Sequence, residues 1–152
     1  MTATPSGGDC GFHAISWALL HLSGPTLSST DVRRKLSTHV RQNTAFYSDL
    51  LRRQGHWELA DETANAVATF SRSVLMEGVN GHWLGQMWGE IELLALAKAF
   101  TVCVELYCFE VAPQQLRRYA RFEEGKRVVR LLFTGSAQAG HFDVLLPRRT
   151  WW

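Results

Sequence analysis

The sequence predicts an α+β domain in which helices come first and pack on a small, mostly antiparallel β-sheet that follows them. Over roughly the first hundred residues, apolar side chains recur at intervals of three and four, which is typical of helices that cover a core. From residue 101 onward, runs rich in β-branched and aromatic residues favour strands instead. With 152 residues, 46% of them hydrophobic, the chain suffices for one packed domain, and we expect residues 1–152 to form it.

The helical half of the chain contains five predicted segments. The first begins at Cys10 and carries an apolar stripe until Gly24 stops it. Ser28–Asp31 supplies N-cap chemistry for the second. The clearest helix runs from Trp88 to Phe100, with strong helix formers and an apolar far end that predicts burial. Helices are thus expected over residues 10–22, 29–40, about 46–55, 57–74 and 88–100.

The strand half follows without a linker. Residues 101–109 are rich in valine, cysteine and aromatic side chains, and Glu123–Lys126 has the composition of a turn between two further strands. Strands are expected over residues 101–109, 116–122, 127–133 and 142–146, the last closed by Pro147.

Charge and cysteine content exclude several classes of protein. The net charge is only +2 and the arginines are spread along the chain, so charge alone indicates neither a nucleic-acid nor a membrane partner. Three cysteines without a dense spacing pattern argue against a disulfide framework and favour a reducing, cytoplasmic compartment. Cys103 and Cys108 lack the further ligands that would complete a metal site, so we expect no metal or other cofactor.

Cys10 is the first candidate for chemistry. It lies where a glycine-rich loop enters a helix, and the unpaired N–H groups there favour a thiolate and lower a cysteine pKa. Gly7 and Gly8 allow close approach of the backbone, the geometry that an oxyanion hole needs. Asp9 must point away, since a carboxylate beside the sulfur would raise its pKa. The alternative is an ordinary cysteine at a helix start.

A second candidate lies far downstream, at the start of the last strand. Strand alternation places the side chains of His141 and Asp143 on one face, with Phe142 on the other, so the carboxylate can orient the imidazole as a base. The alternative is a surface strand with two polar residues.

Five further histidines compete for the role of base. His13 shares the helix of Cys10 and is interpreted as a packed or supporting residue. His82, beside Trp83 in a glycine-rich loop, is a candidate for the wall of a substrate cleft. The others are interpreted as helix residues without polar partners: His21, His39 and His56.

Taken together, the motifs resemble the OTU (ovarian-tumour) family of cysteine proteases, most of which are deubiquitinases. The stretch from Gly7 to Ile15 is similar to the family's cysteine loop and helix. Trp88–Ala97 is similar to its Trp-Gly helix, and His141–Asp143 to its His-aromatic-Asp ending. The motifs occur in family order over almost the whole chain.

The resemblance implies a papain-like OTU fold and hydrolysis of isopeptide bonds after the C-terminal glycine of ubiquitin, or of a ubiquitin-like protein, by a monomeric domain. It implies that Cys10 is the nucleophile, His141 the base and Asp143 its orienter. The oxyanion hole is assigned to Gly8, Asp9 and Cys10, and the substrate cleft to Gly7, His82, Trp83, Gly140 and Phe142.

Within the family, the motifs resemble those of compact domains in viral replicase polyproteins. A nucleophile so near the first residue suggests a domain excised from a larger protein. The resemblance implies activity in the host cytoplasm, with a site in its own polyprotein as an alternative substrate. One position departs from the family: Gly7 stands where an Asp usually braces the oxyanion loop. Two alternatives therefore stay open, a catalytically impaired ubiquitin-binding module and a papain-like amidase that acts on small peptides.

Overall fold

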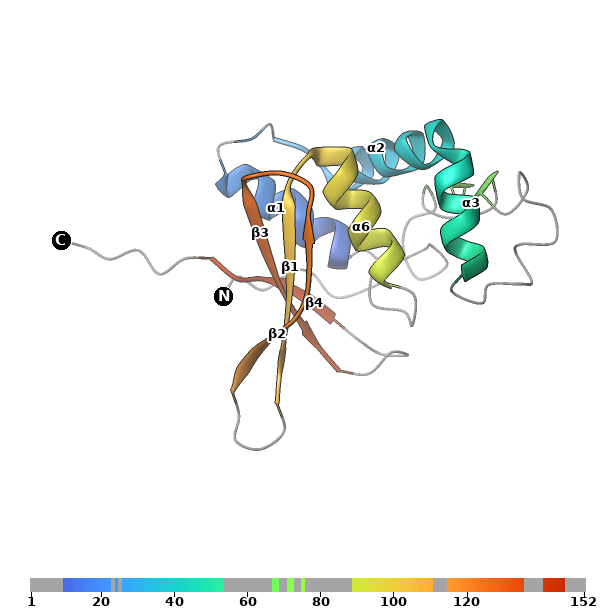
Figure 1. Cartoon of the computed structure of the whole chain (residues 1–152). Coiled ribbons are helices and arrows are strands. Elements are labelled where there is room, and N and C mark those ends of the chain that lie inside the picture. Colours follow the sequence, from blue (N-terminus) through green and yellow to red (C-terminus); the bar gives the residue numbers. More distant parts are fainter. Residues whose placement is uncertain are drawn as a thin grey trace.

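The structure is a computed structural model that describes residues 10–22, 24, 26–53, 67–68, 71–72, 75, 89–110, 115–135 and 141–146. These residues form helices followed by a small sheet, so the predicted α+β class is confirmed (Figure 1). The described helices are α1 (Cys10–His21), α2 (Ser29–Gln42), α3 (Thr44–Arg53) and α6 (Gly89–Phe100). The described strands are β1 (Cys103–Phe109), β2 (Leu116–Glu123), β3 (Val128–Thr134) and β4 (His141–Val144). Most of the helix expected over residues 57–74 lies outside the described residues.

The four strands form one mixed sheet in the order β2-β1-β3-β4. β1 pairs antiparallel with β2 and parallel with β3, and β3 pairs antiparallel with β4. Two of the three pairings are therefore antiparallel, as predicted. The chain segment between β2 and β3 joins two strands that are not neighbours, because β1 lies between them.

The connection from β2 to β3 crosses directly over the start of β1. Glu124 N–H donates to the Val102 carbonyl at 3.3 Å, and Cys103 N–H donates to the Arg127 carbonyl at 2.8 Å. The crossing passes so close that a Cβ at Gly125 would lie 1.9 Å from the Thr101 carbonyl oxygen. Only glycine fits there, which explains the glycine in the predicted turn.

Thr101 makes the sharp change of direction between α6 and β1. Its φ is 52°, a left-handed conformation that β-branched residues rarely adopt. Val102 N–H donates to the Ala97 carbonyl at 3.0 Å, the bond that closes a Schellman-type helix end. Only two residues therefore separate the end of α6 from the start of β1.

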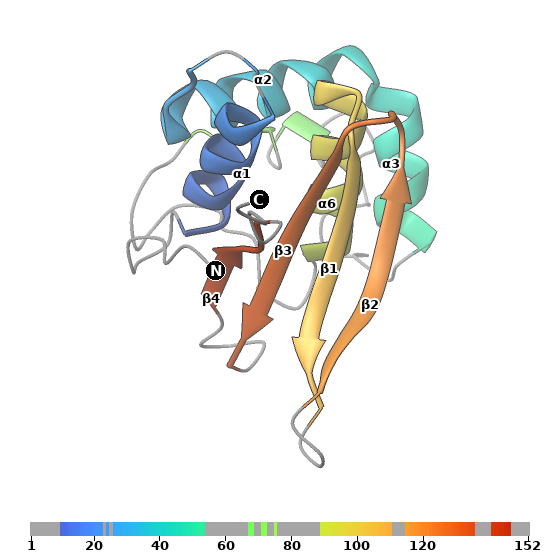
Figure 2. The same cartoon turned by 90° about the vertical axis from the view of Figure 1, so that its left-hand side faces the viewer.

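One face of the sheet packs on the helices and forms the core (Figure 2). Strand alternation sends Val104, Leu131 and Phe142 to this face, and all three are buried among α1 and α6 side chains. Arg33 on α2 is also fully buried, with its guanidinium carbon 3.9 Å from the centroid of the Phe12 ring. Within the described residues, no helix has the length and apolar character needed to span a membrane.

The N-cap of α2 provides a first test of the fold. Ser28 Oγ accepts from Asp31 N–H at 3.1 Å, and Asp31 Oδ2 accepts from Ser28 N–H at 3.0 Å, a complete capping box. We expect Ser28→Ala to lower the free energy of unfolding by about 1 kcal/mol, because the cap bond is lost. Urea unfolding followed by circular dichroism measures this loss, and Ser29→Ala, one residue inside the helix, is the matched control. Equal losses in both variants would contradict the cap.

Candidate functional site

The N-terminus of α1 and the strand β4 meet at the candidate site. Cys10, the first residue of α1, is 1% exposed, and its sulfur faces the backbone N–H of Phe142 in the middle of β4. Residues that lie more than a hundred positions apart are thereby brought together. The thiol contacts the strand between the two polar residues that the sequence singles out.

His141 and Asp143 lie side by side on β4, as strand alternation predicts. His141 Nε2 and Asp143 Oδ1 are 3.1 Å apart, and the Asp143 side chain is 10% exposed against 29% for His141. With the carboxylate accepting the Nε2 proton, Nδ1 is the ring nitrogen suited to take a proton from a thiol. The carboxylate is also placed to stabilise the imidazolium that such a transfer forms.

The resting thiol is less acidic than the sequence predicts. Burial raises the pKa of Cys10 above its ordinary value, while the N–H groups of Phe142, Gly11 and Cys10 act to lower it and the charge of Asp143 raises it further. The N–H groups at the helix start do favour the thiolate, but the loss of hydration on burial outweighs them. The expectation of a lowered pKa for Cys10 is therefore wrong.

This raised pKa has a consequence for stability at alkaline pH. A group whose folded pKa exceeds its unfolded value stabilises the fold below the unfolded pKa, about 8.5 for cysteine, and loses that stabilisation as pH rises through the folded pKa. We expect Cys10→Ala to reduce the alkaline loss of stability by up to about 1.4 kcal/mol per pH unit. Urea unfolding between pH 8 and pH 10 in reductant tests this. Burial also raises the pKa of Cys108, but this thiol is present in both proteins, so its effect on the comparison cancels. Parallel pH profiles would contradict the prediction.

The other predicted site residues fall into two groups. Phe142 was expected to line the cleft, but its ring is 1% exposed and packs on Phe133 with the ring centroids 5.1 Å apart. Its side chain belongs to the core, because alternation turns it away from His141, and its backbone N–H is what faces the thiol. The remaining predicted residues lie outside the described residues: Gly7, Gly8, Asp9, His82, Trp83 and Gly140.

Two histidines interpreted as lacking polar partners do have them. His21 Nδ1 lies 2.8 Å from the Trp17 carbonyl oxygen, one helical turn back. His39 Nε2 lies 2.7 Å from the hydroxyl of Tyr47, which is 0% exposed. The second pair joins α2 to α3, and no local pattern in the sequence indicates a contact between two helices. Burial followed by the charge of Lys98 lowers the pKa of His39.

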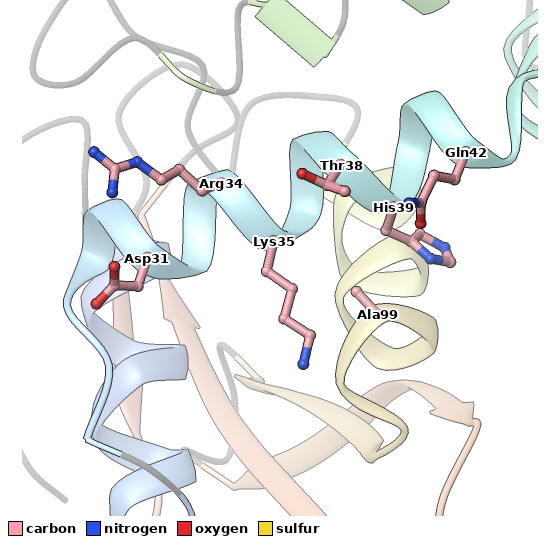
Figure 3. Close-up of a pocket in the computed structure, with 7 residues that line it drawn as sticks. All are labelled: Asp31, Arg34, Lys35, Thr38, His39, Gln42 and Ala99. Atoms are coloured by element: carbon pink, nitrogen blue, oxygen red, sulfur yellow. The ribbon is translucent and has the colours of Figure 1, made fainter.

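A polar groove of about 410 Å³ lies along α2 (Figure 3). Its lining comes from α2 and α6 and includes no residue of α1 or β4, so it is separate from the thiol and the His141–Asp143 pair. Figure 3 shows Lys35 and His39 on the side of α2 that faces Ala99. The lining residues are Asp31, Arg34, Lys35, Thr38, His39, Gln42 and Ala99.

No group of metal-ligating side chains is present in the part of the chain that the structure describes. All three cysteines are free thiols. The sulfur of Cys103 accepts a hydrogen bond from Nε of Arg121 at 3.3 Å.

Comparison with solved structures identifies the fold. The OTU domain of OTUD1 matches with a TM-score of 0.66 and 15% identity, over 95% of this chain and 83% of that one. An OTU deubiquitinase from Wolbachia pipientis bound to ubiquitin matches with a TM-score of 0.62 and 13% identity, over 97% and 94%. The viral OTU domain protease from Dera Ghazi Khan virus matches with a TM-score of 0.52 and 14% identity, over 94% and 79%. No family model and no curated protein matches the sequence. The chain therefore has the fold of OTU domains.

Proposed function

We propose that this chain is an OTU-type cysteine hydrolase that cleaves the isopeptide bond after the C-terminal glycine of ubiquitin. The observation that carries the proposal is the meeting of Cys10 with β4 between His141 and Asp143. The fold shared with OTU domains, one of them described as bound to ubiquitin, supports ubiquitin as the partner. A thiol, an imidazole and a carboxylate in this order form the constellation that acyl transfer requires.

In the first half of the reaction, the thiol proton of Cys10 passes to Nδ1 of His141 as the sulfur attacks the carbonyl carbon of the terminal glycine. The carbonyl oxygen becomes an oxyanion, which the backbone N–H of Cys10 at the helix start would stabilise. Gly8 and Asp9 remain the predicted source of the other N–H groups of the oxyanion hole.

In the second half, the imidazolium of His141 donates its proton to the departing lysine amine, and the C–N bond breaks to leave a thioester on Cys10. Water then attacks the thioester with His141 as base, which releases the glycine carboxylate and restores the thiol. Asp143 holds Nε2 throughout and stabilises each imidazolium.

The raised pKa of Cys10 bears on how the reaction begins. A neutral thiol in the free enzyme favours proton transfer during attack over a thiolate formed beforehand. The alkylation rate of Cys10 should therefore depend strongly on His141.

An electrophilic ubiquitin C-terminal probe tests the proposal. We expect the wild-type protein to form a covalent adduct and Cys10→Ala to form none, while Cys103→Ala, which also removes a buried cysteine, keeps the adduct. Mass spectrometry of the intact protein measures all three. An adduct that persists in Cys10→Ala, or that is lost equally in both variants, would refute the assignment.

A second candidate, a ubiquitin-binding module without activity, is favoured by the deep burial of the thiol, 1% exposed, and by Gly7. It predicts ubiquitin binding in calorimetry with no adduct. The papain-like amidase predicts neither binding nor adduct, yet rapid labelling of Cys10 by a small thiol reagent.

A further inference from the structure

The face of the sheet opposite the helices carries an unusual group of charges. The carboxylate of Glu105, on the central strand β1, is only 6% exposed. Arg118 Nη1 donates to it at 2.9 Å and Arg130 Nε lies 3.0 Å from it, so arginines from both neighbouring strands converge on one acid. Arg121 approaches the same carboxylate at 3.8 Å. Although burial alone raises its pKa, the Arg118 hydrogen bond and the arginine charges hold the pKa of Glu105 below its ordinary value.

The group has more positive than negative charge. Three guanidiniums surround Glu105. Among the described residues, the only other acid in contact with these arginines is Glu123, which lies 3.7 Å from Arg121 and is 67% exposed. One positive charge is left over even when Glu123 is counted in full. The arginine side chains are also 50%, 41% and 41% exposed for Arg118, Arg121 and Arg130, so they can still donate to an outside group.

Exposed apolar side chains lie next to these arginines. Phe109 and Leu116 are cross-strand partners at the far end of the β1–β2 pair and are 54% and 46% exposed. Figure 1 shows this end of the two strands reaching beyond the helices. Figure 2 shows β2 as the outer strand of the sheet, so one edge of β2 has no strand beside it among the described residues. We call these six residues the arginine face: Glu105, Phe109, Leu116, Arg118, Arg121 and Arg130.

The arginine face continues the face that bears the candidate active site. The register places Asp143 opposite Leu132, Leu132 beside Tyr107, and Tyr107 opposite Arg118. These side chains project to the same side of the sheet, where Leu132 is itself covered and Tyr107 is half-buried. Three strand spacings of about 4.8 Å put the Asp143 and Arg118 backbones roughly 14 Å apart. An extended peptide of about four or five residues spans that distance.

From these observations we propose that the arginine face binds an acidic, apolar segment of the protein attached to the leaving amine, and so selects acidic substrates. The inference rests on the proposed function, in which His141 protonates that amine and the departing chain starts beside it. Carboxylates of the segment would meet the exposed arginines, and an apolar side chain would lie on Phe109 and Leu116. A nucleic acid would use the charges but gain nothing from the aliphatic Leu116, so we favour the protein partner.

The test separates binding from catalysis. The probe is a short fluorescent peptide with one leucine followed by glutamates at alternate positions, and its Kd is measured by fluorescence anisotropy. We expect Arg118→Gln and Leu116→Ser each to weaken binding about fivefold and Glu105→Gln to tighten it, because the last substitution increases the surplus charge. Arg34→Gln on α2, which removes an equal charge from another surface, is the control and should leave Kd unchanged.

A second measurement uses ubiquitin joined through an isopeptide bond to the same peptide or to its glutamine counterpart. The ratio of kcat/KM for the acidic over the neutral substrate should fall about fivefold in Arg118→Gln and stay constant in Arg34→Gln. Peptide binding that does not respond to Arg118, Leu116 or Glu105, or single-stranded RNA that binds more tightly than the peptide, would overturn the proposal. If neither substrate is cleaved, the proposed function fails, and the Kd values still decide whether the face binds acidic segments.

Discussion

Gly125→Ala is expected to destabilise the protein by about 3–5 kcal/mol, among the largest losses that one methyl group can cause. The added Cβ would lie 1.9 Å from the Thr101 carbonyl oxygen and 2.9 Å from the Val102 nitrogen. Both are backbone atoms held by α6 on one side and β1 on the other, so no side-chain rotation relieves the clash. The segment between β2 and β3 must therefore move away from the start of β1. The hydrogen bonds that Glu124 and Cys103 make there are then lost.

Chemical denaturation of the purified protein measures this effect. Lys126→Ala, an exposed neighbour in the same crossing, is the matched control and should change stability by no more than about 0.5 kcal/mol. Equal stability of Gly125→Ala and wild type would mean that the chain does not pass over the start of β1 as described.

The second large effect is expected at the His141–Asp143 pair. Under the proposed mechanism, His141→Ala removes the base and lowers kcat/KM by about 10²–10⁴-fold. Asp143→Ala leaves the imidazole without its partner at 3.1 Å, and we expect a loss of about 10²-fold or more. Asp143→Asn should retain more activity than the alanine variant, because its amide oxygen can still accept the Nε2 proton.

Hydrolysis of a fluorogenic ubiquitin conjugate provides kcat/KM for these variants. Asp49→Asn is the control: it makes the same chemical change in an exposed ion pair with Arg53 on α3 and should leave the rate unaltered. A fully active His141→Ala protein would remove His141 from the mechanism.

The elements that local sequence determines were predicted well. The apolar stripe after Cys10 predicts a helix over 10–22 and the structure has one over Cys10–His21, because the spacing of the buried residues is itself the signal. Likewise, β1 begins two residues after the predicted start, where the left-handed Thr101 turns the chain. The catalytic roles of Cys10, His141 and Asp143 remain predictions, although the structure brings their segments together.

What the sequence did not indicate depends on contacts between distant segments. The order of the strands in the sheet determines that β1 pairs in parallel with β3 and that the chain crosses at Gly125. The periodicity of apolar residues in the sequence does not indicate this order. Glu105 appears in the sequence as one acid in an apolar run, and its arginines come from two other strands. The pKa of Cys10 also depends on a distant segment, since besides burial the charge of Asp143 on β4 raises it and the N–H of Phe142 acts to lower it.

The contact between α1 and β4 has a consequence for when the chain becomes reactive. During synthesis the thiol on α1 emerges more than a hundred residues before His141, and closing so long a loop is a late and slow event in folding. Until β4 adds to the sheet, Cys10 has neither His141 nor the Phe142 N–H beside it. Under the proposed function, reactivity toward ubiquitin would therefore be acquired last, once the sheet is complete.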